Sequence, residues 1–463
     1  MNRPPTAFGE AKRTVALAFP IMAGFLGQML LGLTDTLMIG RVGVTPLAAS
    51  AFANTLVHVL LIAGIGLLAA VAVLVSHAHG AGKHAEAGEA LRHGLLTAAI
   101  YGALGTLLLF ALFPFLRFFG QPAEVVAAAR PYLDIIALSL LFSLLTICLK
   151  NYTEAKASPW PAFWILGGAI LLNVFLNWVF IFGNLGSPAL GLTGAGIATF
   201  LARAAGLAGM IWLVFADARF RESLPVRWFA AVDREVTARL LRIGFPVSLQ
   251  LLMEVGAFSM ATLAAGWIGV TALAAHQIAL TCAGTTFMFP LGISQAVTIR
   301  IGHAMGRGHA DRVARIGFGA VGMGVLIMAG FALCFLFFGE MIAAGFTADP
   351  EVRRLAATLL IVAGIFQLFD GTQVVSIGAL RGLHDVRVPT AVVFIAYWII
   401  ALPLGWLIAF PLDLGAVGIW SGLALGLAAA ATGLSARFSR LARREVRKIA
   451  PDPDLVEPVA AQP

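Results

Sequence analysis

Long apolar runs of roughly 20 residues recur along nearly the whole chain, and each can cross a hydrocarbon core that is ~30 Å thick. Because lipid offers no hydrogen-bond partners, a spanning segment must be a helix or part of a closed barrel. The runs are too long and too uniformly apolar for barrel strands. The pattern therefore predicts an all-α integral membrane protein with about twelve transmembrane helices.

The composition agrees with a membrane protein. Of the 463 residues, 60% are hydrophobic and only 12% are charged, whereas a soluble domain carries about 25% charged residues. The three cysteines, Cys148, Cys282 and Cys334, lie in apolar runs without the spacing of a disulfide framework or metal site. Phosphate-binding loops, zinc-protease motifs and nucleophile elbows have no match in the sequence. We therefore expect neither an enzyme nor an ATP-driven pump, and no cofactor.

The basic residues define a topology. If both termini are cytoplasmic, 25 of the 31 Lys and Arg residues lie on the cytoplasmic side, five lie outside, and Arg203 lies within a helix. This distribution satisfies the positive-inside rule along the whole chain. The net charge of +8 therefore reflects topology and argues against a nucleic-acid partner. We expect a multi-pass protein of the inner (plasma) membrane. Two histidine-rich stretches, at 76–84 and 302–309, are interpreted as basic turns in cytoplasmic loops.

The chain contains an internal duplication. Residues 19–82 align without a gap to residues 245–308, with about twenty identities that include Gly66 with Gly292, His77 with His303 and Gly80 with Gly306. Six helices per copy give both copies the same orientation, so the halves are related by an axis along the membrane normal, with a cavity between them. We expect two pseudo-symmetric six-helix lobes.

These observations predict five segments. They are a cytoplasmic N-terminal segment (1–13), an N-lobe (14–216), a cytoplasmic interlobe linker (217–238), a C-lobe (239–437) and a disordered cytoplasmic tail (438–463).

Three acidic residues, Asp35, Glu254 and Asp370, lie inside apolar runs. A carboxylate near the centre of a membrane helix costs roughly 3 kcal/mol or more, so such residues usually face a polar cavity and serve transport. The acids also break the repeat, because Asp35 aligns with Ala261 and Glu254 aligns with Gln28. We therefore expect these carboxylates to carry the coupling cation.

Polar companions accompany the acids at helical spacing. They are Gln250 before Glu254, Gln367 and Gln373 on either side of Asp370, the pair Asn173 and Asn177, and Thr193 at the start of the next helix. Carboxylate and amide oxygens suit a hard cation, which makes Glu254 and Asp370 a candidate Na⁺ site. Desolvated carboxylates can carry protons instead, and the sequence leaves both ions open. Arg203 can pair with an acid, snorkel or stabilise packing, and packing is the favoured role. For His276 a cap or interface role and a functional role are both left open.

At these residues the chain resembles the multidrug and toxic compound extrusion (MATE) family. The resemblance covers nearly the whole chain and rests on residues 20–40 (PIMAGFLGQMLLGLTDTLMIG), 253–255 (MEV), 274–279 (AAHQIA), 299–306 (IRIGHAMG) and 370–382 (DGTQVVSIGALRG). A Glu in the seventh helix and an Asp in the tenth look like the NorM branch. The resemblance implies that Glu254 and Asp370 form a C-lobe cation site, and that Asp35, Asn173 and Asn177 form an N-lobe site.

The resemblance further implies exchange of Na⁺ or H⁺ for small, amphipathic, mostly cationic organic substrates, across a membrane whose lipid surrounds the protein. Some Na⁺-using relatives carry a Tyr four residues before the Asp of the tenth helix, where this chain has Phe366. That departure leaves H⁺ open as the coupling ion.

Two other functions are weighed. A flippase for lipid-linked precursors shares the two-lobed architecture and would need basic residues in its central cavity, where Arg203 is the single mid-helix basic candidate. A structural membrane protein without transport activity is the other alternative.

Overall fold

A computed structural model describes residues 7–225 and 227–449. Within these ranges the regular structure is helical, and twelve helical segments are long and apolar enough to cross a membrane. The spans that contain a single α-helix are α1 (Ala7–Gly40), α2 (Val44–Gly80), α3 (His84–Leu112), α4 (Ala123–Ala155), α5 (Pro159–Phe182), α6 (Gly191–Ala216), α8 (Arg234–Ile268), α9 (Val270–Gly306), α10 (Asp311–Ala344), α11 (Pro350–Gly382) and α14 (Gly415–Ile449).

The remaining span is composite. It consists of α12 (Arg387–Phe394), the π-helical segment η3 (Ile395–Ala401) and α13 (Leu402–Ala409). The 3₁₀ helix η1 (Phe113–Phe119) continues the span that begins with α3, and two short helices, η2 (Asn184–Gly186) and α7 (Ala218–Arg221), lie in connections. The predicted all-helical membrane fold is confirmed.

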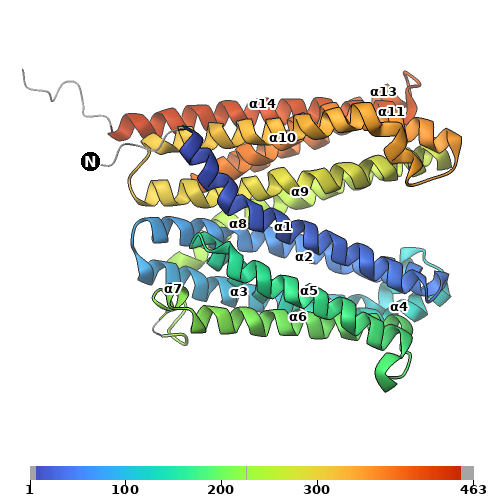
Figure 1. The fold of residues 1–463 in the computed structure, drawn as a ribbon, viewed down its shortest axis with the longest axis horizontal. Coiled ribbons are helices and arrows are strands. Elements are labelled where there is room, and N and C mark those ends of the chain that lie inside the picture. Colours follow the sequence, from blue (N-terminus) through green and yellow to red (C-terminus); the bar gives the residue numbers. More distant parts are fainter. Residues whose placement is uncertain (1–6, 226, 450–463) are drawn as a thin grey trace, which may run out of the picture.

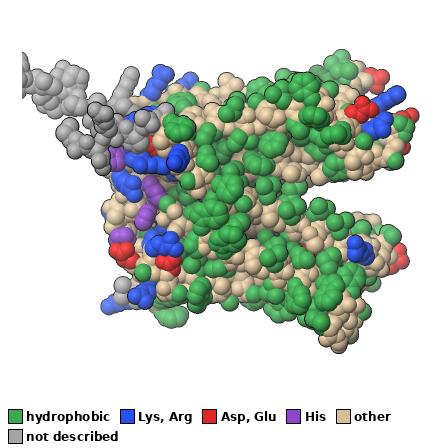
Figure 2. Space-filling model, in the orientation of Figure 1, with side chains coloured by type: hydrophobic (Ala, Val, Ile, Leu, Met, Phe, Trp, Pro, Cys, Tyr) green, Lys and Arg blue, Asp and Glu red, His purple; other side chains and the backbone are tan. Residues whose placement is uncertain are grey.

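The helices form two lobes that meet at one end and separate at the other (Figures 1 and 2). The joined end contains the turns 81–83, 156–158, 307–310 and 383–386, and most of the blue and purple side chains of Figure 2 gather there. We call this the basic end. At the opposite end Figure 2 shows an open cleft between the lobes, so the molecule is closed at its basic end and open at the other.

Helix α1 belongs to both lobes. Near the basic end its residues Leu17, Ala18 and Ile21 are buried in the hydrophobic core that α9, α10, α11 and α14 build. At the opposite end Ile39 is buried in the other core, with α2, α3 and α4. Figure 1 shows the helix crossing from one lobe to the other. Pro20, which removes a backbone donor from the helix, lies in the crossing segment.

Helix α8 makes the reciprocal crossing. Its residues Leu240, Ile243 and Val247 are buried in the core of α2, α3 and α4, whereas Ala257 is buried with α9 and α11. Pro246, which pairs with Pro20 in the repeat, lies inside this helix. The first helix of each repeat therefore packs its basic-end half against the lobe of the other repeat.

Two glycines bring α2 and α9 into backbone contact at the basic end. A Cβ atom added to Gly80 would lie 2.6 Å from the carbonyl oxygen of His303, and one added to Gly306 would lie 2.7 Å from the amide nitrogen of Ala81 and would collide with the carbonyl oxygen of His77. Real Cβ atoms essentially never approach closer than 3.0 Å. The two contacts are equivalent, because His77 and His303 are paired positions of the repeat.

A second pair of glycines joins the crossing helices to the other lobe. A Cβ atom added to Gly66 of α2 would lie 2.6 Å from the amide nitrogen of Ser248 in α8. One added to Gly292 of α9 would lie 3.1 Å from the Cα of Met22 in α1 and would collide with its side chain. Ser248 and Met22 are again paired positions. The glycine identities of the repeat therefore mark contacts between the lobes.

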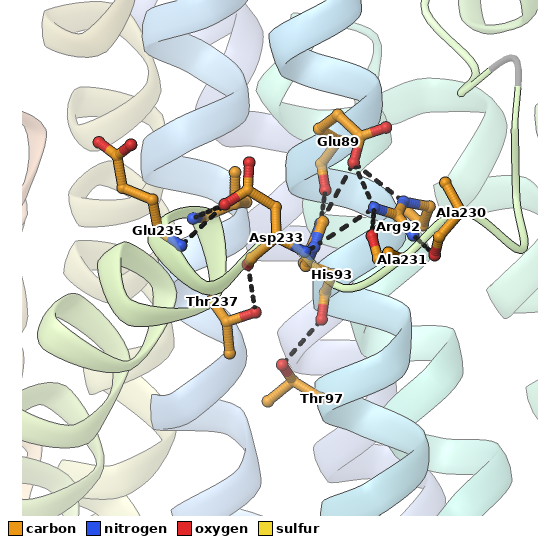
Figure 3. Close-up of polar contacts among 10 residues, drawn as sticks. Glu89, Arg92, His93, Thr97, Ala230, Ala231, Asp233, Glu235 and Thr237 are labelled. Atoms are coloured by element: carbon orange, nitrogen blue, oxygen red, sulfur yellow. Dashed lines mark hydrogen bonds and ion pairs between the residues drawn. The ribbon is translucent and has the colours of Figure 1, made fainter.

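The linker between the repeats is docked on α3 (Figure 3). Arg92 donates from Nη1 to the carbonyl of Ala230 at 2.8 Å and from Nη2 to the carbonyl of Ala231 at 3.1 Å. His93 Nε2 accepts from the backbone N–H of Asp233 at 3.0 Å. Because these bonds use the linker backbone, they fix its path independently of its side chains. Asp233 then caps α8 by accepting from two backbone N–H groups.

The start of the linker is docked in the same way on α4. Lys156 donates from Nζ to the carbonyl of Arg219 at 2.5 Å and to the hydroxyl of Ser223 at 2.8 Å. Tyr152 donates its hydroxyl to the carbonyl of Phe220 at 2.9 Å. The linker is therefore part of the N-lobe surface, and a relative movement of the lobes has to be taken up within α1 and α8.

The prediction of a disordered tail from residue 438 is wrong for residues 438–449. Helix α14 continues to Ile449, with Phe438 and Ala442 buried. Phe438 packs edge to face against Phe318, with ring centroids 5.3 Å apart, and Arg437 donates from Nε to Asp385 at 2.9 Å. These contacts extend the helix beyond the apolar run. Residues 450–463 lie outside the described residues.

We expect Gly306→Ala to loosen the closed basic end. The added methyl group meets the backbone of α2, and overpacking of this kind costs about 1–3 kcal/mol. The variant should unfold at a lower temperature, and a cysteine introduced at Ala81 should react faster with a water-soluble maleimide. The matched control is Gly319→Ala in α10, where an added Cβ has no heavy atom within 4 Å. Equal behaviour of the two variants would contradict the assigned contact.

Candidate functional site

The C-lobe cluster is centred on Glu254, which α8 places beside α11 and η3. Glu254 Oε1 accepts from the hydroxyl of Tyr397 at 3.2 Å and from Nε2 of Gln373 at 3.4 Å. The glutamate is half-buried, whereas Tyr397 and Gln373 are fully buried. Three different helices thus converge on one carboxylate oxygen.

Asp370 lies one turn before Gln373 on α11 and is buried. Its carboxylate interacts electrostatically with that of Glu254, and no hydrogen bond to it occurs within the described part of the chain. Two carboxylates that interact in an apolar environment repel each other when both are charged. The pair can be relieved by a proton or a metal cation, so the arrangement suits reversible cation binding.

The amide groups predicted to accompany the acids divide into two kinds. Gln367 accepts at Oε1 from the hydroxyl of Thr286 at 2.7 Å, which ties α11 to α9. Gln373 directs its nitrogen to Glu254, and its Oε1 is buried without a hydrogen-bond partner among the described residues. Gln250 is buried on α8, one turn before Glu254. Of the three glutamines, Gln373 is therefore the one that contacts an acid directly.

Aromatic rings close this cluster on one side. Phe258 packs edge to face against Phe366 and Tyr397, with ring centroids 6.0 Å and 5.9 Å apart. Phe366 packs in turn against Trp420, at 5.3 Å. Trp420 donates from Nε1 to Nδ1 of His276 at 3.1 Å, and both side chains are fully buried. His276 thus orients an aromatic wall from inside α9, and the cap role considered for it does not apply.

The N-lobe cluster joins α1, α5 and α6. Asn177 donates from Nδ2 to Asp35 Oδ1 at 2.5 Å and to Asn173 Oδ1 at 2.9 Å. Asn173 donates from its own Nδ2 to the hydroxyl of Thr199 at 3.3 Å. The hydroxyl in this chain of bonds is that of Thr199, six residues beyond the predicted Thr193 on the same helix. Asp35, Asn173 and Asn177 are thus brought together.

Arg203 lies beside this cluster. It donates from Nη1 to the hydroxyl of Ser139 at 2.7 Å and interacts electrostatically with Asp35 and with Tyr132. Tyr132 donates its hydroxyl to Asn54 at 3.3 Å. A positive charge therefore acts on the N-lobe acid, which agrees with the acid-pairing alternative for Arg203 rather than with the favoured packing role. Arg381 of α11 interacts with Glu254 in the same way, so each acid cluster has a nearby arginine, and the clusters differ in that the C-lobe cluster holds two carboxylates and the N-lobe cluster holds one.

Tyr397 is the site residue that the sequence did not indicate. It lies within an apolar run more than 140 positions from Glu254, so nothing in its local pattern marks it. The signal available was its rarity, because the chain has only four tyrosines. The hydroxyl of Tyr397 thus supplies the acid pair with the phenol group that Phe366 lacks.

Two repeat-related helical lobes, each with a buried cluster of acid and amide groups, define a polytopic membrane transporter. A family model described as MatE matches residues 20–179 and 246–407. The chain is 38% identical to a Bradyrhizobium diazoefficiens protein named "Probable multidrug resistance protein NorM", over 94% of this chain and 95% of that protein. A Pseudomonas aeruginosa protein of the same name is 37% identical, over 93% of this chain and 89% of that protein. The chain belongs to the MATE family of transporters.

Solved structures of MATE transporters have the same fold. A structure titled as the outward-facing conformation of a multidrug resistance MATE family transporter superposes with a TM-score of 0.87 and 20% identity, covering 95% of this chain and 97% of that one. A mutant of a Vibrio cholerae MATE transporter superposes with a TM-score of 0.87 and 23% identity, covering 95% and 98%. The expected family and fold are thereby confirmed.

We expect Asn177→Ala to destabilise the N-lobe. The change leaves the half-buried carboxylate of Asp35 and the buried Oδ1 of Asn173 without their amide donor, and an unsatisfied buried partner costs about 1–3 kcal/mol. Thermal unfolding of the purified protein in detergent should show a lower midpoint. The control is Thr34→Ala on α1, whose hydroxyl donates to the carbonyl of Leu30 in its own helix. The assigned contact would be refuted by an equal midpoint for both variants.

Proposed function

We propose that the chain is a secondary active multidrug efflux antiporter that exports small, amphipathic, mostly cationic organic compounds in exchange for Na⁺ or H⁺. The observation that carries this proposal is the pair of carboxylates, Glu254 and Asp370, that interact inside an aromatic cluster of the C-lobe. The names of the relatives from Bradyrhizobium diazoefficiens and Pseudomonas aeruginosa, probable multidrug resistance proteins, support the substrate class.

Coupling follows from competition for the acid pair. A cation held by Glu254 and Asp370 neutralises the charge that would otherwise attract an organic cation, so the site favours one positively charged occupant at a time. Inward movement of the coupling cation releases about 2.3 kcal/mol per charge for each 100 mV of membrane potential. That free energy can drive export when the lobes open alternately to the two sides.

Both coupling ions are compatible with the groups present. For Na⁺, the two carboxylates, the free Oε1 of Gln373 and the hydroxyl of Tyr397 offer oxygen ligands. For H⁺, a buried carboxylate that repels its neighbour binds a proton readily. The N-lobe acid Asp35, together with Asn173 and Asn177, serves as a second cation or substrate site. The secondary contributors are Gln250, Gln367 and, in place of Thr193, Thr199.

The orientation proposed for the protein places the basic end in the cytoplasm and both termini on that side of the inner membrane. The positive-inside rule supports this assignment, because the turns and the linker at the basic end carry most of the Lys and Arg residues. In this orientation the cleft of Figure 2 opens away from the cytoplasm. The described conformation is then the one that releases an exported compound and admits the coupling cation.

We expect Glu254→Gln and Asp370→Asn each to reduce gradient-driven ethidium efflux from proteoliposomes. Each change removes a negative charge that the cation and the substrate share, and a loss of ~1.4 kcal/mol already corresponds to a factor of about ten in affinity. The control is Glu351→Gln, which removes a carboxylate from the exposed start of α11. Efflux that persists unchanged in both site variants would rule out coupling at this pair.

The coupling ion can be identified in the same vesicles. Efflux from the unmodified protein is measured under an imposed Na⁺ gradient and, separately, under a pH gradient. If Na⁺ is the ion, Tyr397→Phe should weaken coupling by removing one oxygen ligand, and the half-saturating Na⁺ concentration should rise. If H⁺ is the ion, efflux should proceed under the pH gradient in Na⁺-free buffer. Absence of efflux under both gradients would overturn the antiporter proposal.

A further inference from the structure

A pocket of about 470 Å³ lies at the basic end, away from both acid clusters. Residues of α1, of the connection into α5, of α9 and of α10 line it, so it spans the boundary between the two lobes. The lining is basic and includes four arginines and one tryptophan: Arg13, Arg300, Arg307, Arg312 and Trp160. The efflux mechanism proposed above makes no use of this cavity.

The charge of the pocket is only partly compensated. Glu10, buried on α1, accepts from Nε and Nη2 of Arg312 at 2.9 Å and 2.7 Å and forms an ion pair with Arg300. Arg13 and Arg307 are exposed, and neither makes a side-chain hydrogen bond or ion pair within the described ranges. The carboxylate of Glu10 thus neutralises only part of the charge of four guanidinium groups, which leaves an excess positive charge in the cavity.

The arginines also repel one another. The positive charges of Arg13 and Arg312 both repel that of Arg300. The positive charges of Arg300 and Arg307 both disfavour a positive charge on the ring of His303. Such a group of cations is stabilised by an anion that several of them contact at once. The start of α5 adds to the attraction, because its N-terminus has no side-chain cap and Pro159 and Trp160 line the same pocket.

The mouth of the pocket lies next to exposed aromatic surface. Trp160, which belongs to the pocket wall, packs against Phe19 with ring centroids 6.1 Å apart and stacks on Trp164 at 6.3 Å. All three side chains are exposed although they lie on predicted membrane spans, with 68% of Trp164 accessible. Aromatic residues in this position are typical of the membrane interface, where an apolar ring faces the acyl region below the headgroups.

We propose that this pocket binds the phosphate group of an anionic phospholipid from the leaflet at the basic end. The arginines hold the phosphate, and the acyl chains leave the pocket along the surface of Phe19, Trp160 and Trp164. Basic pockets between membrane helices are known to recognise anionic lipid headgroups in this way. Free phosphate shares the headgroup chemistry, but it makes no use of the aromatic surface at the mouth.

The test compares two double variants of the full-length protein. Arg13→Gln with Arg307→Gln removes two charges from the pocket and leaves the Glu10 ion pairs in place. Arg221→Gln with Arg227→Gln removes two exposed charges from the linker at the same end of the molecule, outside the pocket. Both variants change the net charge equally, so a general attraction of the basic end to anionic membranes affects them alike.

The readout is the affinity for phosphatidylglycerol and, separately, for phosphatidylcholine, obtained from the thermal midpoint during titration into detergent micelles and from lipid retained in native mass spectrometry. We expect the pocket variant to bind phosphatidylglycerol roughly 30-fold more weakly than the unmodified protein, and the linker variant to bind it unchanged. A parallel titration with inorganic phosphate and with glycerol phosphate, in the same micelles, identifies the source of the phosphate group.

Each outcome decides the proposal. Stabilisation by phosphatidylglycerol that only the pocket variant loses, with no comparable effect of the soluble phosphates, supports it. Equal stabilisation by inorganic phosphate would make the cavity a site for a soluble anion and would overturn the lipid assignment. Equal loss in both variants would reduce the effect to surface charge and would also overturn it, as would equal affinity of the unmodified protein for phosphatidylglycerol and phosphatidylcholine.

Discussion

The backbone contact between α2 and α9 is the constraint on which the rest of the structure depends. Gly80 and Gly306 let two long helices from different lobes touch without side chains between them, and the repeat makes the contact symmetric. Because each helix continues for more than 30 residues from this point, a small change of angle at the contact becomes a large displacement at the opposite end. The width of the cleft is therefore controlled at the end of the molecule where the lobes are closed.

The contacts between the lobes follow the symmetry of the repeat, whereas the acid clusters do not. The paired glycines have equivalent neighbours in the two repeats, whereas the acids have none: Asp35 aligns with Ala261, and Glu254 aligns with Gln28. The two repeats thus contribute equivalent contacts between the lobes, and they differ in the groups proposed to bind ions. A duplicated scaffold can change one site without disturbing the geometry of the contact.

The sequence predicted those features that depend on local pattern. The spans, the duplication and the three acids within the spans could all be predicted from hydropathy, identity and position, and so could the pairing of Asn173 with Asn177 on one helix face. The features that were missed depend on contacts between distant segments. Tyr397 reaches Glu254 from another helix. Thr199 takes the place expected for Thr193 because the rotation of α6 is set by packing.

The same reason explains two errors of assignment. For Arg203 the sequence favours packing over pairing with an acid, since a single arginine in a helix does not reveal its contacts with the Ser139 hydroxyl and the Asp35 carboxylate. The helical extension of α14 is not indicated by the sequence because its polar composition resembles a solvated tail, whereas the buried side chains of Phe438 and Ala442 anchor it. Hydropathy describes the environment of a segment and does not identify its partner.

The crossing of α1 has a consequence for biosynthesis. This helix leaves the ribosome before the second repeat, yet the surface that covers Leu17, Ala18 and Ile21 belongs to α9 and α10, which are made more than 200 residues later. During that interval the basic-end half of α1 must remain in the bilayer with its packing face turned to lipid. The first repeat therefore cannot reach its final structure by itself, and the protein matures as one unit once the second repeat has been inserted.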